Sequence, residues 1–109
     1  MSKSAPFVCD MTALSSEKRA RHHELAALLQ SSLTAIRELA DGFEFEFPWS
    51  PDAYDALAEI TPLEYACCPF FDISIRIESE SNRLCWQLTG REGIKPFIRA
   101  EFGKWFGEL

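Results

Sequence analysis

The sequence predicts a small α+β domain with the element order α-β-α-β-β-α. Three short segments, at 43–47, 71–77 and 84–88, alternate apolar and polar residues, which is typical of half-buried strands. Apolar residues at helical spacing flank them. Strands with a single apolar face need helices stacked on that face. We therefore expect a three-stranded antiparallel sheet, in the order one-three-two, with helices packed on one face: a truncated ferredoxin-like arrangement plus an N-terminal helix.

The chain should form one domain over residues 1–109, because 109 residues with 47% apolar composition can build a single core. Residues 1–13 carry no periodic pattern and are predicted to be an irregular N-terminal arm. Leu25, Leu29 and Ile36 recur at helical spacing, so the first helix is expected from Ser15 or Ser16 to Ala40. Asp41-Gly42 would end it.

The first strand, Phe43–Phe47, should present its phenylalanines to the core. Ser50-Pro51-Asp52 is a strong start signal for the second helix. Pro62 falls inside this helix, where proline costs about 3 kcal/mol. We therefore expect a break near Thr61 and then a short helix that reaches Cys67.

The second and third strands, Phe71–Ile77 and Leu84–Leu88, are predicted to form a hairpin across a polar turn. A capping box at Thr89-Gly90-Arg91-Glu92 should open the third helix. Pro96 is expected to interrupt that helix, which would continue to about Phe106.

The net charge of −6 and the scattered basic residues argue against a nucleic-acid partner. The first residues have no long apolar run, and no segment approaches the ~20 apolar residues of a membrane span. We therefore expect a cytoplasmic protein with no membrane partner. Thiols stay reduced in that compartment, so the four cysteines should be free thiols, ligands or core residues.

The most chemically distinctive feature is the pair Cys67-Cys68, followed directly by Pro69. Pro69 disfavours a helical Cys68, so the pair should lie at the end of the second helix. Glu64 precedes the pair at helical spacing and should share its face. Two thiolates and a carboxylate suit soft or borderline cations such as zinc, cadmium, mercury or copper(I).

Two further donors lie elsewhere in the chain. Cys9 would add a third sulfur if the arm folds back, and His22 follows the same helical row as Leu25 and Leu29. A site for zinc or another soft metal ion is therefore predicted from Cys67, Cys68, Cys9, His22 and Glu64.

Two other interpretations of the cysteines stay open. Free cysteine is often buried as a small hydrophobe, so the thiols could be ordinary core residues. They could also be redox-active, because a disulfide between neighbouring residues is strained and easily reduced. A helix C-terminus raises the thiol pKa, which disfavours a reactive nucleophile. We therefore favour metal binding, and we expect a binding protein and not an enzyme.

A homodimer is also expected. The polar face of the sheet and the aromatic residues Trp105 and Phe106 near the C-terminus offer area for a second copy or a small ligand. The polar face should carry these side chains: Glu44, Glu46, Asp72, Ser74, Arg76, Cys85, Gln87 and Thr89.

The motif Glu64-x-x-Cys67-Cys68-Pro69-Phe70-Phe71, followed by Leu88-Thr89-Gly90-x-Glu92-Gly93-x-Lys95-x-Phe97, resembles a family of small, uncharacterised bacterial proteins. The resemblance extends toward Cys9 and the first helix. It implies a bacterial cytosolic domain and carries over no established activity. Pro96 departs from the family pattern beside Lys95.

Overall fold

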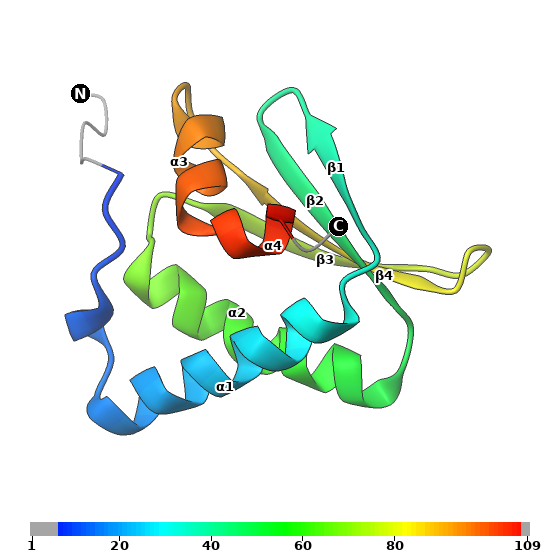
Figure 1. The fold of residues 1–109 in the computed structure, drawn as a ribbon, viewed down its shortest axis with the longest axis horizontal. Helices are drawn as coiled ribbons and strands as arrows, with labels where there is room; N and C mark the ends of the chain where they lie inside the picture. Colours follow the sequence, from blue (N-terminus) through cyan, green and yellow to red (C-terminus); the bar gives the residue numbers. More distant parts are fainter. Residues whose placement is uncertain (1–6, 108–109) are drawn as a thin grey trace.

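A four-stranded antiparallel sheet and the helices on one of its faces make up the described part of the chain, residues 7–107 of a computed structural model (Figure 1). The strand order is β1-β2-β4-β3. The elements are η1 (Met11–Ala13), α1 (Ser16–Ser32), β1 (Ala35–Leu39), β2 (Gly42–Pro48), α2 (Pro51–Cys67), β3 (Asp72–Glu78), β4 (Arg83–Thr89), α3 (Ile94–Glu101) and α4 (Gly103–Gly107).

The α+β class is as predicted, but the three-stranded sheet is wrong. The end of the predicted first helix is the edge strand β1, and α1 stops at Ser32. Ala35 to Leu39 pairs antiparallel with β2, with Leu39 opposite Gly42. Asp41-Gly42 therefore belongs to a hairpin turn and not to a helix end. Backbone pairing with β2 decides this segment, whose spacing alone also fits a helix.

The second helix is also longer than predicted. α2 begins at Ser50, which accepts a hydrogen bond from the Ala53 N–H at 3.0 Å, and runs without a break to Cys67. Pro62 lies inside it, so the expected break near Thr61 is wrong. Pro62 and Ala58 are both exposed, and Pro62 has no N–H to donate to the Ala58 carbonyl.

The C-terminal region forms two short helices in place of one interrupted helix. Thr89 is the last residue of β4, so the predicted capping box there is wrong. α3 begins after Gly93, whose left-handed φ of 96° suits glycine. The chain turns at Phe102, and α4 follows.

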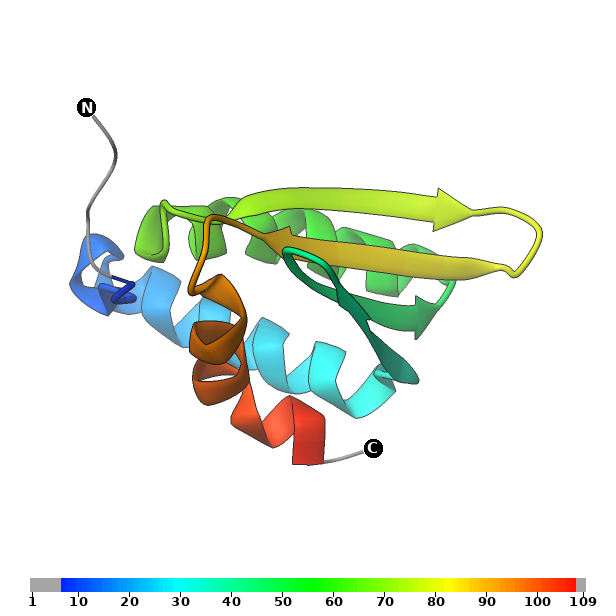
Figure 2. The same cartoon turned by 90° about the horizontal axis from the view of Figure 1, so that it is seen from above.

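The core lies between the sheet and the helices, and the helices gather on one side of the sheet (Figures 1 and 2). Phe43, Phe45, Phe47 and Trp86 are almost completely buried on this face. α1 contributes Leu25 and Leu29, and α2 lies beside it.

The N-terminal arm is only partly irregular. Residues 1–6 lie outside the described residues, whereas Met11–Ala13 is a 3-10 helix capped by Asp10. Phe7 packs against Phe70 and Phe97, with ring centroids 5.1 and 5.7 Å away. The arm therefore lies against the body of the domain, which brings Cys9 to the end of α2 (Figure 1).

Candidate metal or metalloid centre

The arm and the end of α2 are joined by a disulfide between Cys9 and Cys68. The backbone N–H of Asp10 also donates to the Cys67 carbonyl at 2.9 Å. Cys68 is the cap residue after α2, and its φ of −128° and ψ of 72° are no longer helical. Pro69 accounts for this conformation, because proline disfavours a helical predecessor. The expectation of reduced thiols at these two positions therefore does not hold in this structure.

Glu64 is the central residue of the site. Its carboxylate Oε1 lies 2.8 Å from His22 Nε2, and its Oε2 lies 3.5 Å from Cys68 Sγ. The side chain is only 6% exposed. Since α1 packs beside α2, His22 reaches a carboxylate that follows it by 42 positions in the chain.

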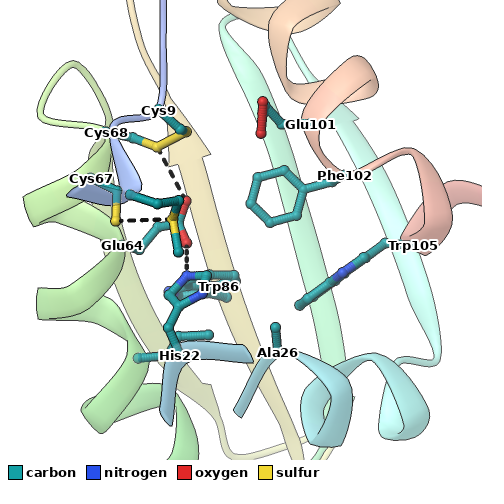
Figure 3. A pocket seen from close by; sticks show the side chains of 12 residues that line it. Cys9, His22, Ala26, Glu64, Cys67, Cys68, Trp86, Glu101, Phe102 and Trp105 are labelled. Atoms are coloured by element: carbon teal, nitrogen blue, oxygen red, sulfur yellow. Dashed lines mark hydrogen bonds and ion pairs between the residues drawn. A yellow bond between two sulfur atoms is a disulfide. The ribbon is translucent and has the colours of Figure 1, made fainter. Parts of the chain in front are cut away.

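Ligand atoms from three residues converge at this point. Cys9 Sγ, Cys68 Sγ and a Glu64 carboxylate oxygen all lie within 4.8 Å of one another. Figure 3 shows the disulfide, Glu64 and His22 in a row along the end of α2. The structure thus brings together Cys9, Cys68, Glu64 and His22 from the predicted site.

Cys67 is the predicted ligand that does not join this group. Its buried thiol donates a hydrogen bond to Met11 Sδ at 3.4 Å, away from the Cys9–Cys68 pair. Burial, together with the negative charges of Glu64 and Asp10, raises the pKa of the Cys67 thiol. Cys67 is therefore a protonated thiol at neutral pH. Both cysteines line one cavity, but their sulfurs have different partners, because the helix ends between them.

A cavity of about 370 Å³ adjoins the sulfur atoms. Phe102 and Trp105 lie across it from the cysteines, and Trp86 lies between the two sides (Figure 3). These residues were not predicted as part of a site. They come from β4, the turn after α3, and α4, so local spacing carried no signal. The full lining also includes Met11, Ala26, Ile60 and Glu101.

A second group of possible ligands, Glu44, Glu46 and Cys85, lies on the polar sheet face. Both Glu44 oxygens already accept hydrogen bonds, at 2.6 Å from Arg37 and at 3.1 Å from Arg76. A cation there would have to displace these guanidinium groups. We therefore assign this group to an ion-pair network and not to a metal site.

The residues of this chain alone indicate what the site can bind. The arrangement offers two sulfurs, a carboxylate and an imidazole beside a cavity, and it becomes a ligand set only when Cys9 and Cys68 are reduced. No protein-family model, curated protein or solved structure matches the chain.

Proposed function

We propose that the protein binds a soft metal or metalloid ion when Cys9 and Cys68 are reduced. The supporting observation is the convergence of Cys9 Sγ, Cys68 Sγ and a Glu64 oxygen within 4.8 Å. His22, in contact with Glu64, is the fourth donor or orients the carboxylate. Zinc is the simplest occupant, because it accepts sulfur, nitrogen and oxygen ligands together.

The ligand set differs from the predicted one in its use of the paired cysteines. Cys68 and Cys9 supply the thiolates, while Cys67 lies behind them against Met11. Thiolates bind soft cations, and a disulfide does not offer thiolates. The proposal therefore includes a reducing compartment, such as the cytoplasm, in which the pair is open.

Titration of the reduced protein with Cd²⁺ tests this function. Sulfur-to-cadmium charge transfer in the ultraviolet reports thiolate ligation directly. We expect Cys9→Ser and Cys68→Ser to remove the band, and Glu64→Gln to weaken binding by roughly tenfold or more. Cys85→Ser is the matched control, because Cys85 is a free, buried thiol on the other side of the sheet.

The result that would reject metal binding is equal cadmium uptake by the wild type and the Cys9→Ser/Cys68→Ser double variant. Cys67→Ser adds a separate measurement. It should bind nearly as well as the wild type, since the Cys67 thiol contacts Met11.

A second candidate function is thiol–disulfide exchange, favoured by the Cys9–Cys68 bond itself. The two candidates differ in catalysis. A redox protein would accelerate the reduction of a model disulfide by a small thiol, whereas a metal-binding protein would leave that rate unchanged. We place this function second because Cys68 is completely buried and Cys9 only partly accessible.

Two other expectations stay predictions. Membership of the small bacterial family with the paired-cysteine motif is one. Homodimer formation is the other, and sedimentation at micromolar concentration measures it. The aromatic tail offers less surface than expected, because Trp105 is buried and Phe106 packs edge-to-face on Phe43 with ring centroids 5.1 Å apart. Among residues 7–107, no helix combines the length and apolar character of a membrane span.

A further inference from the structure

The cavity beside Cys9 and Cys68 is larger than a bare ion requires. Its volume is about 370 Å³. An apolar cavity of roughly 150 Å³ is already large enough to hold a benzene molecule. An ion held by Cys9, Cys68 and Glu64 at one end would leave most of this space without an occupant. The size therefore points to a ligand that has more than a metal or metalloid centre.

The two sides of the cavity differ in chemistry. The sulfur atoms and the Glu64 carboxylate lie on the α2 side, and the aromatic rings of Phe102 and Trp105 lie on the opposite side, with Glu101 at its edge (Figure 3). Trp86 and Ile60 add buried apolar surface. A ligand that fits both sides has a thiol-seeking centre at one end and an apolar group at the other.

The number of available thiols narrows the class of ligand. Cys9 and Cys68 can bond one centre together. Cys67 also lines the cavity, but its thiol donates to Met11 Sδ, away from that pair. Inorganic trivalent arsenic bonds three sulfurs. Trivalent arsenic that already carries a carbon substituent needs only two, and the product is neutral and three-coordinate. A pair of thiols beside an apolar cavity matches this second stoichiometry.

We propose that the preferred ligand is an organoarsenic(III) compound, whose arsenic bonds Cys9 and Cys68 and whose organic group lies against Phe102 and Trp105. The inference rests on the proposed function, since it assigns a ligand class to the same site.

The binding step conserves oxidation state. Two molecules of a small thiol first reduce the Cys9–Cys68 disulfide to two thiols and are themselves oxidised to a disulfide. An arsenic oxide R–As=O then forms two As–S bonds, and both thiol protons leave with the oxygen as water. Glu64, with Oε2 3.5 Å from Cys68 Sγ, is placed to accept the Cys68 proton on its way to that oxygen. Arsenic stays trivalent throughout.

Competition against dithiothreitol provides the test. Dithiothreitol holds arsenic through the same two As–S bonds, so the exchange constant cancels the strength of those bonds. The reduced protein is equilibrated with phenylarsine oxide or methylarsine oxide, and native mass spectrometry counts the adducts. We expect exchange to favour the protein about tenfold or more for the phenyl compound over the methyl compound, because only the phenyl group buries a large apolar area.

Ala26→Leu is the matched variant, because Ala26 lines the cavity from α1 and its side chain points into it (Figure 3). The added carbons should remove the phenyl preference, because they occupy the space of the phenyl group. Ala27→Leu places the same group at an exposed position of the same helix and should behave as the wild type. Neither variant deletes a core side chain, and circular dichroism checks that both fold.

The outcomes separate the inference from the function beneath it. Equal exchange constants for the phenyl and methyl compounds, with both binding through Cys9 and Cys68, would overturn the inference and keep soft-ligand binding. A phenyl preference that survives Ala26→Leu would also overturn it, because the group would then lie outside the cavity. No adduct beyond that of the Cys9→Ser/Cys68→Ser variant would also overturn the inference, and the cadmium titration of the same reduced protein then decides whether soft-ion binding stands.

Discussion

Trp86 shows how a single residue ties the core to a polar partner. Its side chain is fully buried, and its indole N–H donates to Thr61 Oγ1 at 3.1 Å. The Thr61 hydroxyl in turn donates to the Leu57 carbonyl at 2.7 Å. One hydroxyl therefore accepts from the sheet and donates within α2. Since a buried donor without a partner is costly, this hydroxyl contributes to stability.

Replacing Thr61 by Val should lower the free energy of unfolding by roughly 1–3 kcal/mol, because the indole N–H loses its acceptor while the side-chain shape is kept. Urea titration measures the change. Thr61→Ser is the control, since it keeps the hydroxyl and should retain most of the stability. Equal stability of the Val variant and the wild type would show that the bond to Trp86 contributes little.

The pKa of Glu44 predicts how acid changes the stability of the folded state. Burial opposes its ionisation, but hydrogen bonds from Gln87, Glu46, Arg37 and Arg76 outweigh burial and lower its pKa from 4.5 to about 2. The folded state therefore holds the proton more weakly than the unfolded state. Its contribution is complete above about pH 4.5 and is lost as the pH falls toward about 2.

We expect Glu44→Gln to be less stable than the wild type at neutral pH by roughly 1–3 kcal/mol. The difference should shrink as the pH falls, because the wild-type carboxylate then takes up its proton. The pKa of Glu46 shifts in the opposite direction, since burial and its neighbour Glu44 raise it. Urea midpoints of both proteins across this pH range measure the effect, and a constant difference would contradict it.

The predicted ligands show what residue spacing can and cannot predict. Helical spacing correctly put Glu64 on the face that meets the cysteines, and the row of Leu25 correctly turned His22 inward. It could not choose between Cys67 and Cys68, because that choice depends on how Pro69 ends the helix. The partner of Cys68 is 59 residues away and depends on how the arm folds back.

At the scale of elements, β1 is the clearest case in which pairing decides what local sequence leaves open. Its sequence, AIREL, contains good helix formers, and Ile36 and Leu39 continue the apolar row of α1. Thr34 N–H donates to the Glu46 carbonyl at 2.8 Å and begins the pairing with β2. A short segment of sequence does not reveal the free energy of the hydrogen bonds between β1 and β2.

Strand β2, in contrast, follows directly from its alternation, and so does the hairpin of β3 and β4. α2 begins where its capping signals predict. Its passage through Pro62 was missed because the cost of a proline depends on exposure. Leu57 and Ile60 before it and Cys67 after it are all buried, so packing on both sides outweighs one missing hydrogen bond.

Gly42, at the start of β2, lies very close to β4. A Cβ at this position would lie 2.0 Å from the Leu88 carbonyl oxygen. We therefore expect Gly42→Ala to lower the unfolding free energy by roughly 1–3 kcal/mol as the strands move apart. Gly103→Ala is the matched control, because a Cβ there has no heavy atom within 4 Å.

The control should be neutral or stabilised by up to about 1 kcal/mol, since alanine favours the helix. Thermal unfolding of both variants measures the contrast. If the two substitutions shift the midpoint alike, the close approach of β2 and β4 at Gly42 is not a constraint.

For the whole molecule, the Cys9–Cys68 bond ties the arm to the centre of the chain. Opening it should lower the free energy of unfolding by about 2–4 kcal/mol, because the unfolded chain regains the freedom of a long loop. Denaturant titrations with and without a thiol reductant measure this. Cys9→Ser should show no dependence on reductant, and Cys85→Ser should keep it in full.

A bound soft ion should restore stability to the reduced protein, because it binds the folded state more tightly than the unfolded chain, and the gain should rise with the logarithm of the ion concentration. A reduced protein as stable as the oxidised one, without any metal, would contradict the contribution of the disulfide.

The bond between Cys9 and Cys68 also makes residues 9–68, a little over half of the chain, a covalent ring that holds both long helices and the β1–β2 hairpin. A protease that cuts one peptide bond inside this ring leaves the oxidised polypeptide in a single piece. The two fragments separate only when a reductant opens the ring. A cut in that region therefore does not divide the oxidised protein, and it divides the chain only after the Cys9–Cys68 disulfide is reduced.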